Sequence, residues 1–376
     1  MKKVNWLVVL SGVAVGIAAL LLSALGNPAN MGFCIACFIR DTVGALQLQS
    51  AGVKELNSPG TLQYIRPEII GLILGSFILS VLRKEFAPKG GSAVITRFIL
   101  GFFAMIGCLV FLGCPFRMIL RLSAGDLNAL VALFGFTCGI GAGVFFLKKG
   151  FSLKRSYRQP VTEGAAMPVI AVALLILLVT APAFIMFSTS GPGSKHAPII
   201  LSLAAGLLVG GMAQYSRLCM VGGIRDLILF REKKLILGFG AIFVAALIGN
   251  LITGKFNIGL TNQYGVVAHF DVLCNFLGML LVGYCCVLLG GCPLRQLILA
   301  GEGNSDSAVT VIGLAVGAAF SHNFKLAAIA ASITDGVKND GGVSTAGKVA
   351  VIIGLIVVTL IAIINTFSVF KRKNAQ

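Results

Sequence analysis

The stretches LGCPFRMIL, residues 112–120, and GGCPLRQLIL, residues 290–299, share the motif Gly-Cys-Pro-x-Arg. Each follows about twenty mostly apolar residues, the length that a helix needs to cross a bilayer. A proline directly after the cysteine suits the first position of a helix, because its missing N–H needs no partner there. Each motif therefore predicts a short re-entrant half-helix whose N-terminus, at the cysteine, points into the membrane and is surrounded by protein or a watery cavity.

The overall composition excludes a soluble protein. Of the 376 residues, 57% are hydrophobic and 11% are charged, and the mean hydropathy is +0.97, whereas roughly a quarter of the residues in a soluble domain are charged. The formal net charge of +17 is concentrated in short basic blocks between long apolar runs. This pattern is typical of cytoplasmic loops that attract anionic membrane lipid, and it lacks the basic domain that nucleic-acid binding requires. We expect an all-α polytopic membrane protein.

Apolar runs of spanning length predict about ten transmembrane helices. With the N-terminus inside, roughly half of the Lys and Arg residues fall on the same side. The positive-inside rule then places both termini in the cytoplasm. As for the membrane itself, we expect the bacterial plasma (inner) membrane. The first run is long enough to span, so we expect a retained helix and not a signal peptide. The expected ranges are 4–25, 65–82, 92–112, 127–147, 166–188, 198–217, 235–253, 266–289, 306–322 and 349–370.

Two motifs recur in the same order, which indicates an internal duplication. CIACFIRD at 34–41 and CMVGGIRD at 219–226 both read Cys-x5-Arg-Asp, and their offset is nearly that of the two Gly-Cys-Pro-x-Arg motifs. The additional span between the halves reverses the second half and favours inverted repeats over a parallel duplication. We expect a first repeat at 1–147, a basic cytoplasmic loop and linking span at 148–197, an inverted second repeat at 198–325, and an outer loop with a C-terminal span at 326–376.

Cysteines at the N-termini of half-helices are expected to line a path for an anion. A helix N-terminus offers free N–H groups and partial positive charge, and a thiol is a polarizable partner for sulfur or selenium. Ionisable groups inside a membrane are costly and usually mark a pathway. The candidate substrate-pathway residues are Cys34, Cys114, Cys219, Cys292, Arg40, Arg117, Arg225 and Arg295, with Cys114 facing Cys292 across the midplane. Asp41 and Asp226 are expected in structural ion pairs with partners outside their own motifs.

Other readings of these residues stay open. The CxxC of Cys34 and Cys37 predicts, as the alternative function, a membrane thiol-disulfide oxidoreductase, although Gly222 replaces the second thiol in the repeat. A purely structural subunit is a third possibility. The three histidines lack metal-ligand spacing, and no catalytic residue, cofactor site or metal site is expected. The cysteines outside the motifs are expected to be small apolar fillers: Cys108, Cys138, Cys274, Cys285 and Cys286.

The duplicated motifs and the span plan resemble the YeeE/YedE family of sulfur-compound membrane transporters. The strings GFCIACFIRDTVGALQL, YIRPEIIGLILG, LGCPFRMILRLSAGDLNALV and FFLKKGFSLKRSY are similar to its branch of selenium transporters. The resemblance implies uptake, without enzymatic activity, of a small selenium- or sulfur-containing anion such as thiosulfate. It also implies an hourglass-like body with a thiol-lined path and transfer to a cytoplasmic carrier protein of the TusA type. The basic loops at 148–158 and 231–234 could dock an acidic carrier, or anchor the chain to anionic lipid.

Overall fold

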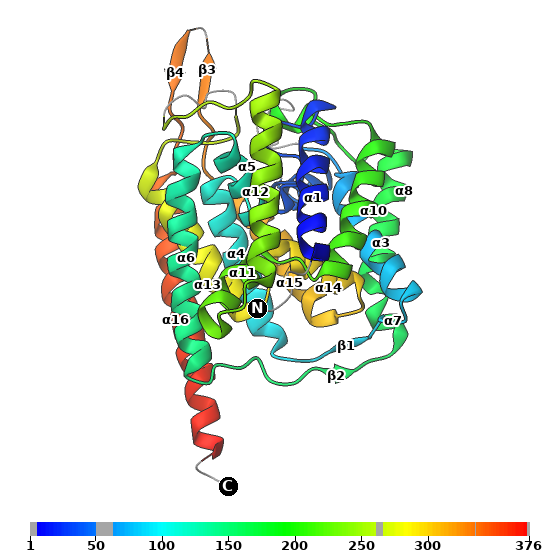
Figure 1. The fold of residues 1–376 in the computed structure, drawn as a ribbon, viewed down its shortest axis with the longest axis vertical. Helices are drawn as coiled ribbons and strands as arrows, with labels where there is room; N and C mark the ends of the chain where they lie inside the picture. Colours follow the sequence, from blue (N-terminus) through cyan, green and yellow to red (C-terminus); the bar gives the residue numbers. More distant parts are fainter. Residues whose placement is uncertain (1–5, 50–62, 261–265, 335, 374–376) are drawn as a thin grey trace.

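The computed structural model describes residues 6–49, 63–260, 266–334 and 336–373 as a helical body (Figure 1). Two short antiparallel ribbons lie at opposite ends of it, β1 (Lys89–Gly90) with β2 (Tyr157–Arg158) and β3 (Ser332–Thr334) with β4 (Val337–Asn339). The helices in chain order are α1 (Trp6–Ala24), α2 (Ile35–Ala45), α3 (Pro67–Leu82), α4 (Val94–Phe111), α5 (Pro115–Ser123), α6 (Leu127–Lys148), α7 (Val161–Gly164), α8 (Ala166–Thr180), α9 (Gly191–Ser194), α10 (Ile199–Ser216), α11 (Met220–Phe230), α12 (Lys234–Ile252), α13 (Val272–Leu289), α14 (Pro293–Gly301), α15 (Ser305–Asn323) and α16 (Thr345–Lys373).

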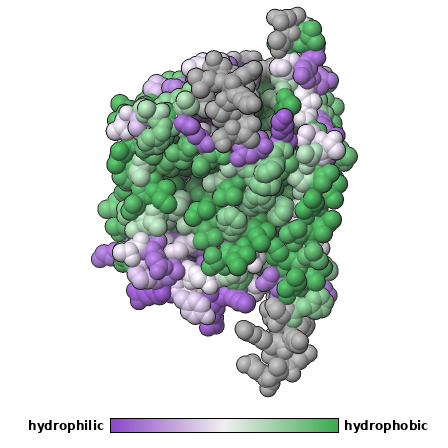
Figure 2. Space-filling view, turned by 180° about the vertical axis from the view of Figure 1, so that it is seen from behind, coloured by the Kyte–Doolittle hydropathy of each residue, from purple (hydrophilic) through white to green (hydrophobic). Residues whose placement is uncertain are grey.

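Seven stretches among the described residues are long and apolar enough to cross a membrane. Four are the single helices α1, α6, α12 and α16, and three are the joined pairs α4–α5, α10–α11 and α13–α14. Figure 2 shows a matching apolar belt around the middle of the body, with hydrophilic residues gathered on either side of it. These features identify an integral membrane protein.

A helix occupies each of the ten ranges expected from the sequence, but not every one meets the criteria for a span. Helices α3 and α8 have only 16 and 15 residues, and α15 is not among the seven spanning stretches of the described chain. Helix α8 ends at Thr180, short of the expected 188, because Ala181 is left-handed (φ 38°) and a proline follows it. Helix α13 begins at Val272 and not at 266, since Asp271 caps it and accepts from the Cys274 N–H.

The core of the body consists of closely packed helix pairs. Glycines at their contacts allow the two helix backbones to approach each other. Gly135 and Gly139 of α6 face the backbone of Phe276 and Leu280 in α13. A Cβ built on Gly139 would lie 2.0 Å from the Leu280 carbonyl oxygen, so a side chain there would force the helices apart. Helix α15 packs on α4 in the same manner, as do α3 on α10 and α1 on α12.

Two breaks in the membrane helices position the site. Helices α4 and α13 pack against each other and end at left-handed residues, Leu112 (φ 60°) and Gly290 (φ 82°). A glycine follows, then the cysteine that caps the next short helix, with proline at its first position. Helices α5 and α14 therefore begin where the sequence predicts. Each forms one apolar stretch with the helix before it, and its re-entrant course in the membrane stays a prediction.

Candidate functional site

The short helices meet at their N-termini and bring the four motif cysteines together in two pairs. Cys34 caps α2 and Cys114 caps α5, and their thiols interact. Cys219 caps α11 and Cys292 caps α14, with their Sγ atoms 4.0 Å apart. All four side chains are buried. Each motif cysteine therefore pairs with the other motif cysteine of its own half, and the facing of Cys114 and Cys292 across the midplane stays a prediction.

Backbone N–H groups surround both thiol pairs. The Gly222 N–H donates to the Cys219 Sγ at 3.3 Å, as in a helix cap. The Cys114 sulfur lies beside the N–H groups of Ala36 and Arg117, in the first turns of α2 and α5. Each pair thus has the free donors and partial positive charge of two helix N-termini, an environment that favours an anion.

Arg117 lies against the first pair and is fully buried. Its Nη1 donates to the Leu112 carbonyl at 2.6 Å and lies 3.6 Å from the Cys37 Sγ. Gly113 leaves the space that its stem occupies, since a Cβ there would be 3.1 Å from the Arg117 Cδ. Its Nε and Nη2 have no hydrogen-bond partner, and no carboxylate pairs with it, among the described residues.

The equivalent Arg295 has a different environment. Its Nη1 lies 3.1 Å from the Glu302 Oε1, and Glu302 also binds Arg217 at 3.0 Å. Arg217 in turn binds Glu85, which pairs with Arg83. This chain of ion pairs, the Arg295–Arg83 network, connects the end of α14 to the loop after α3. The second thiol pair therefore lies beside a positive charge that is already neutralised.

Hydrogen bonds set the ionisation of the outermost carboxylate of this network. The bond that Gln214 donates to Glu85, followed by that from Arg83, lowers the pKa of Glu85 below its ordinary value. Glu85 is therefore ionised at neutral pH, as its two ion pairs require.

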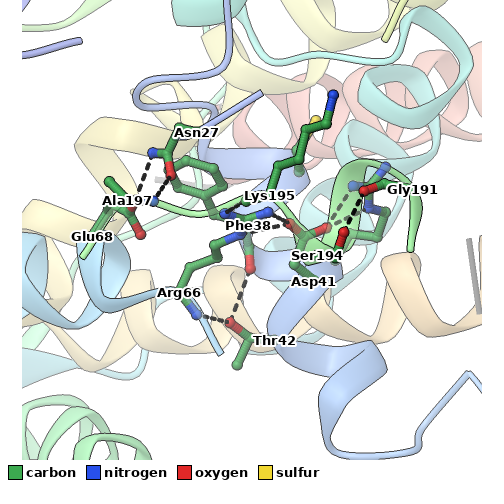
Figure 3. Close-up of polar contacts among 12 residues, drawn as sticks. Asn27, Phe38, Asp41, Thr42, Arg66, Glu68, Gly191, Ser194, Lys195 and Ala197 are labelled. Atoms are coloured by element: carbon green, nitrogen blue, oxygen red, sulfur yellow. Dashed lines mark hydrogen bonds and ion pairs between the residues drawn. The ribbon is translucent and has the colours of Figure 1, made fainter. Parts of the chain in front are cut away.

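Each Arg-Asp motif forms an ion pair within itself, and Asp41 also has the expected partner outside its motif. Arg40 binds the adjacent Asp41, and Arg225 lies 2.8 Å from the adjacent Asp226. In the second motif, Asp226 has no other ion-pair partner among the described residues. In the first, Asp41 also binds Arg66 at 2.8 Å (Figure 3). Arg66 donates further to the Lys195 carbonyl, which ties the loop at Lys195 to the start of α3 and, through Asp41, to α2.

Several residues of the site were not singled out from the sequence. Cys37 contacts Arg117, although the sequence assigns it only to the redox alternative. Cys108 of α4 interacts electrostatically with Cys34 and with Cys286 of α13, and Cys286 with Cys219. Both side chains are buried, and their assignment as small apolar fillers stays a prediction. The sequence feature that could have pointed to Cys108 and Cys286 is their position a few residues before the break that ends α4 and α13.

Among the described residues, no group of three His, Cys, Asp or Glu side chains could hold a metal ion. A pocket of about 390 Å³ lies between α1 and α12 and is lined by Asn30, Lys255 and Leu120, among others. Leu120 belongs to α5 and lies one turn beyond Arg117, so this pocket reaches the helix that carries the first thiol pair.

The apolar belt and the buried thiol pairs define a polytopic membrane protein with an internal polar site. Residues 215–376 match the family described as sulphur transport, and they include both Cys219 and Cys292. No curated protein matches the chain. The match supports the resemblance to the YeeE/YedE family and indicates a membrane transporter for sulfur compounds.

Proposed function

We propose that this chain is a permease that carries a small sulfur- or selenium-containing anion into a bacterium, with thiosulfate or its selenium counterpart as substrate. The observation that carries the proposal is the meeting of buried thiols with helix N-termini at two places. Oxygen atoms of the anion would accept from backbone N–H groups while its soft atom contacts the thiols. The candidate pathway cysteines and arginines serve this function, and no catalytic step is needed.

The path runs between the two thiol pairs, past Cys108 and Cys286. The electrostatic contacts that join these residues to both pairs support this course. The pocket lined by Lys255 is the outer access, since a cation at its wall attracts anions.

The repeats are inverted and the ten helices all cross the inner membrane, with both termini cytoplasmic. The paired packing supports this, because α6 contacts α13 as α15 contacts α4, and α3 contacts α10 as α12 contacts α1. The domain limits are those expected from the sequence, with 1–147 and 198–325 as the repeats. The linking helix α8 supplies the crossing that inverts the second repeat.

A TusA-type carrier receives the substrate on the cytoplasmic side, and the basic loops at 148–158 and 231–234 dock it. Their exposed Lys and Arg residues suit an acidic partner as well as anionic lipid. Neutralising both loops should weaken carrier binding in a pull-down with purified protein. Undiminished binding would leave lipid anchoring as their role.

A second candidate, the thiol-disulfide oxidoreductase, is favoured by the contact between Cys34 and Cys37. It requires a disulfide between them and a quinone or disulfide partner. Loss of thiol oxidation in a Cys37→Ser variant with intact anion flux would select this function.

Uptake into proteoliposomes tests the proposal. Purified protein should admit radiolabelled thiosulfate and its selenium counterpart far faster than protein-free vesicles do. Sulfate, which has no soft terminal atom, should enter slowly. Equal uptake of thiosulfate by protein-containing and empty vesicles would reject the permease.

A further inference from the structure

Arg117 is a buried positive charge without a counterion among the described residues. Its side chain is 0% exposed, and its Nε and Nη2 find no acceptor there. A buried charge that lacks a counterion is strongly unfavourable. A chain that keeps such a group needs a compensating gain, and an anion bound from outside the protein supplies one.

The other buried arginines of this region each have a carboxylate partner. Arg40 and Arg66 share Asp41, and Arg121 pairs with Asp126 at 2.7 Å. The contrast is sharpest with Arg295, the matching residue of the second motif, which Glu302 neutralises. Burial alone therefore does not distinguish Arg117 from the other arginines. It differs from them because no carboxylate among the described residues pairs with it.

The free donors of Arg117 lie among groups that suit a chalcogen anion. Its Nη1 is 3.6 Å from the Cys37 Sγ. The Cys114 sulfur lies beside the Arg117 N–H and interacts with Cys34. Guanidinium donors bind oxygen atoms of an anion with directional, charge-assisted hydrogen bonds, while the three thiols provide the soft surface.

We infer that Arg117 is the residue that binds the substrate anion, which serves as its missing counterion at the Cys34–Cys37–Cys114 cluster. This inference rests on the proposed permease function and adds two properties to it. The site selects anionic over neutral chalcogen species. The affinity for the anion is high at this first cluster. It is lower at the second thiol pair, where Glu302 already neutralises Arg295, so the anion is released there.

Thiosulfate binding to detergent-solubilised protein tests the inference without transport. Sodium thiosulfate should raise the apparent melting temperature of the parent, with sodium chloride at equal ionic strength as reference. Arg117→Met should melt no lower than the parent without ligand, because it removes an uncompensated charge. It should also lose the thiosulfate response. Arg117→Lys should retain part of it. A merely structural arginine would give the opposite pattern, with a less stable variant that still responds.

Transport provides the second readout. In proteoliposomes, Arg117→Met should raise the half-saturating thiosulfate concentration about tenfold to a hundredfold, the loss expected for charge-assisted hydrogen bonds. Arg121→Gln is the matched control: it is on the same helix and equally buried, but its arginine is paired. Assembled Arg121→Gln protein should keep the parent value.

The two proposals fail separately. If Arg117→Met keeps the parent half-saturation and thermal response while transport is intact, the inference is wrong and the permease stands. If the parent binds thiosulfate through Arg117 but admits none into vesicles, the permease is wrong and the binding site stands. A parent without any thiosulfate response overturns the inference.

Discussion

Replacing Glu302 with glutamine should destabilise the protein and create a second unpaired guanidinium. Removing one partner of a buried ion pair costs roughly 3–5 kcal/mol, because the other charge stays buried. The side chains of Arg295 and Glu302 are each 11% exposed, so the lower end applies. The contact with Arg217, which is 47% exposed, adds at most about 1 kcal/mol. The expected loss is therefore about 3 kcal/mol.

The loss can be followed by thermal unfolding in detergent with a thiol-reactive dye, which reports the exposure of buried cysteines. At about 2 °C per kcal/mol, Glu302→Gln should lower the apparent melting temperature by roughly 6 °C. Thiosulfate should restore part of this loss, because an anion can replace the missing carboxylate beside Arg295. Exposed Glu163, which has no ion pair among the described residues, gives the control Glu163→Gln. A Glu302→Gln protein that melts with the parent and ignores thiosulfate would refute the reasoning.

Three further outcomes are expected. Gly139→Ala should cost roughly 1–3 kcal/mol by overpacking and reduce folded yield, whereas Gly141→Ala, with no atom within 4 Å of its Cβ, should be neutral or stabilising; equal yields would contradict the packing. The lowered pKa of Glu85 means that its ion pairs persist from neutral pH down through the ordinary glutamate range. Their stabilisation is complete above the ordinary glutamate pKa and is lost as pH falls from there through the lower, folded-state pKa. Melting curves of the parent and Glu85→Gln should therefore converge only in strong acid, and convergence near pH 6 would count against it. Cysteine labelling at Lys154 and Lys195 should report opposite sides of the membrane, and the same side would remove the inverted topology.

The positions of the short helices could be predicted because their causes are local. A proline after the cysteine and a glycine before it determine where α5 and α14 begin, whatever surrounds them. The membrane class followed equally directly from composition. The predicted ends were less accurate for helices whose limits depend on a cap or a left-handed residue, such as the start of α13 after Asp271.

Compensation through tertiary contacts could not be predicted, but the partner of Arg295 is local: Glu302 follows it by seven residues, where Ala124 follows Arg117. Nothing in the two Gly-Cys-Pro-x-Arg motifs distinguishes Arg117 from Arg295. Glu302 reaches Arg295 only because α14 is one short helix that ends at this carboxylate. Arg66 reaches Asp41 from the start of another helix. Motif symmetry therefore predicted equivalent sites, and a residue just beyond each motif made their charges different.

The most direct test of the central claim is thiosulfate uptake by proteoliposomes that contain the Cys114→Ser, Cys292→Ser double variant. Serine is nearly isosteric with cysteine but offers a harder, less polarizable atom, so packing is kept while the soft contact at both pairs is lost. Cys285→Ser, buried in α13, is the control and should transport like the parent. The thiol-lined path predicts that the double variant, at equal amounts of folded protein, loses most of its initial uptake rate. A double variant that takes up thiosulfate as fast as the parent would contradict the path and leave these cysteines as packing.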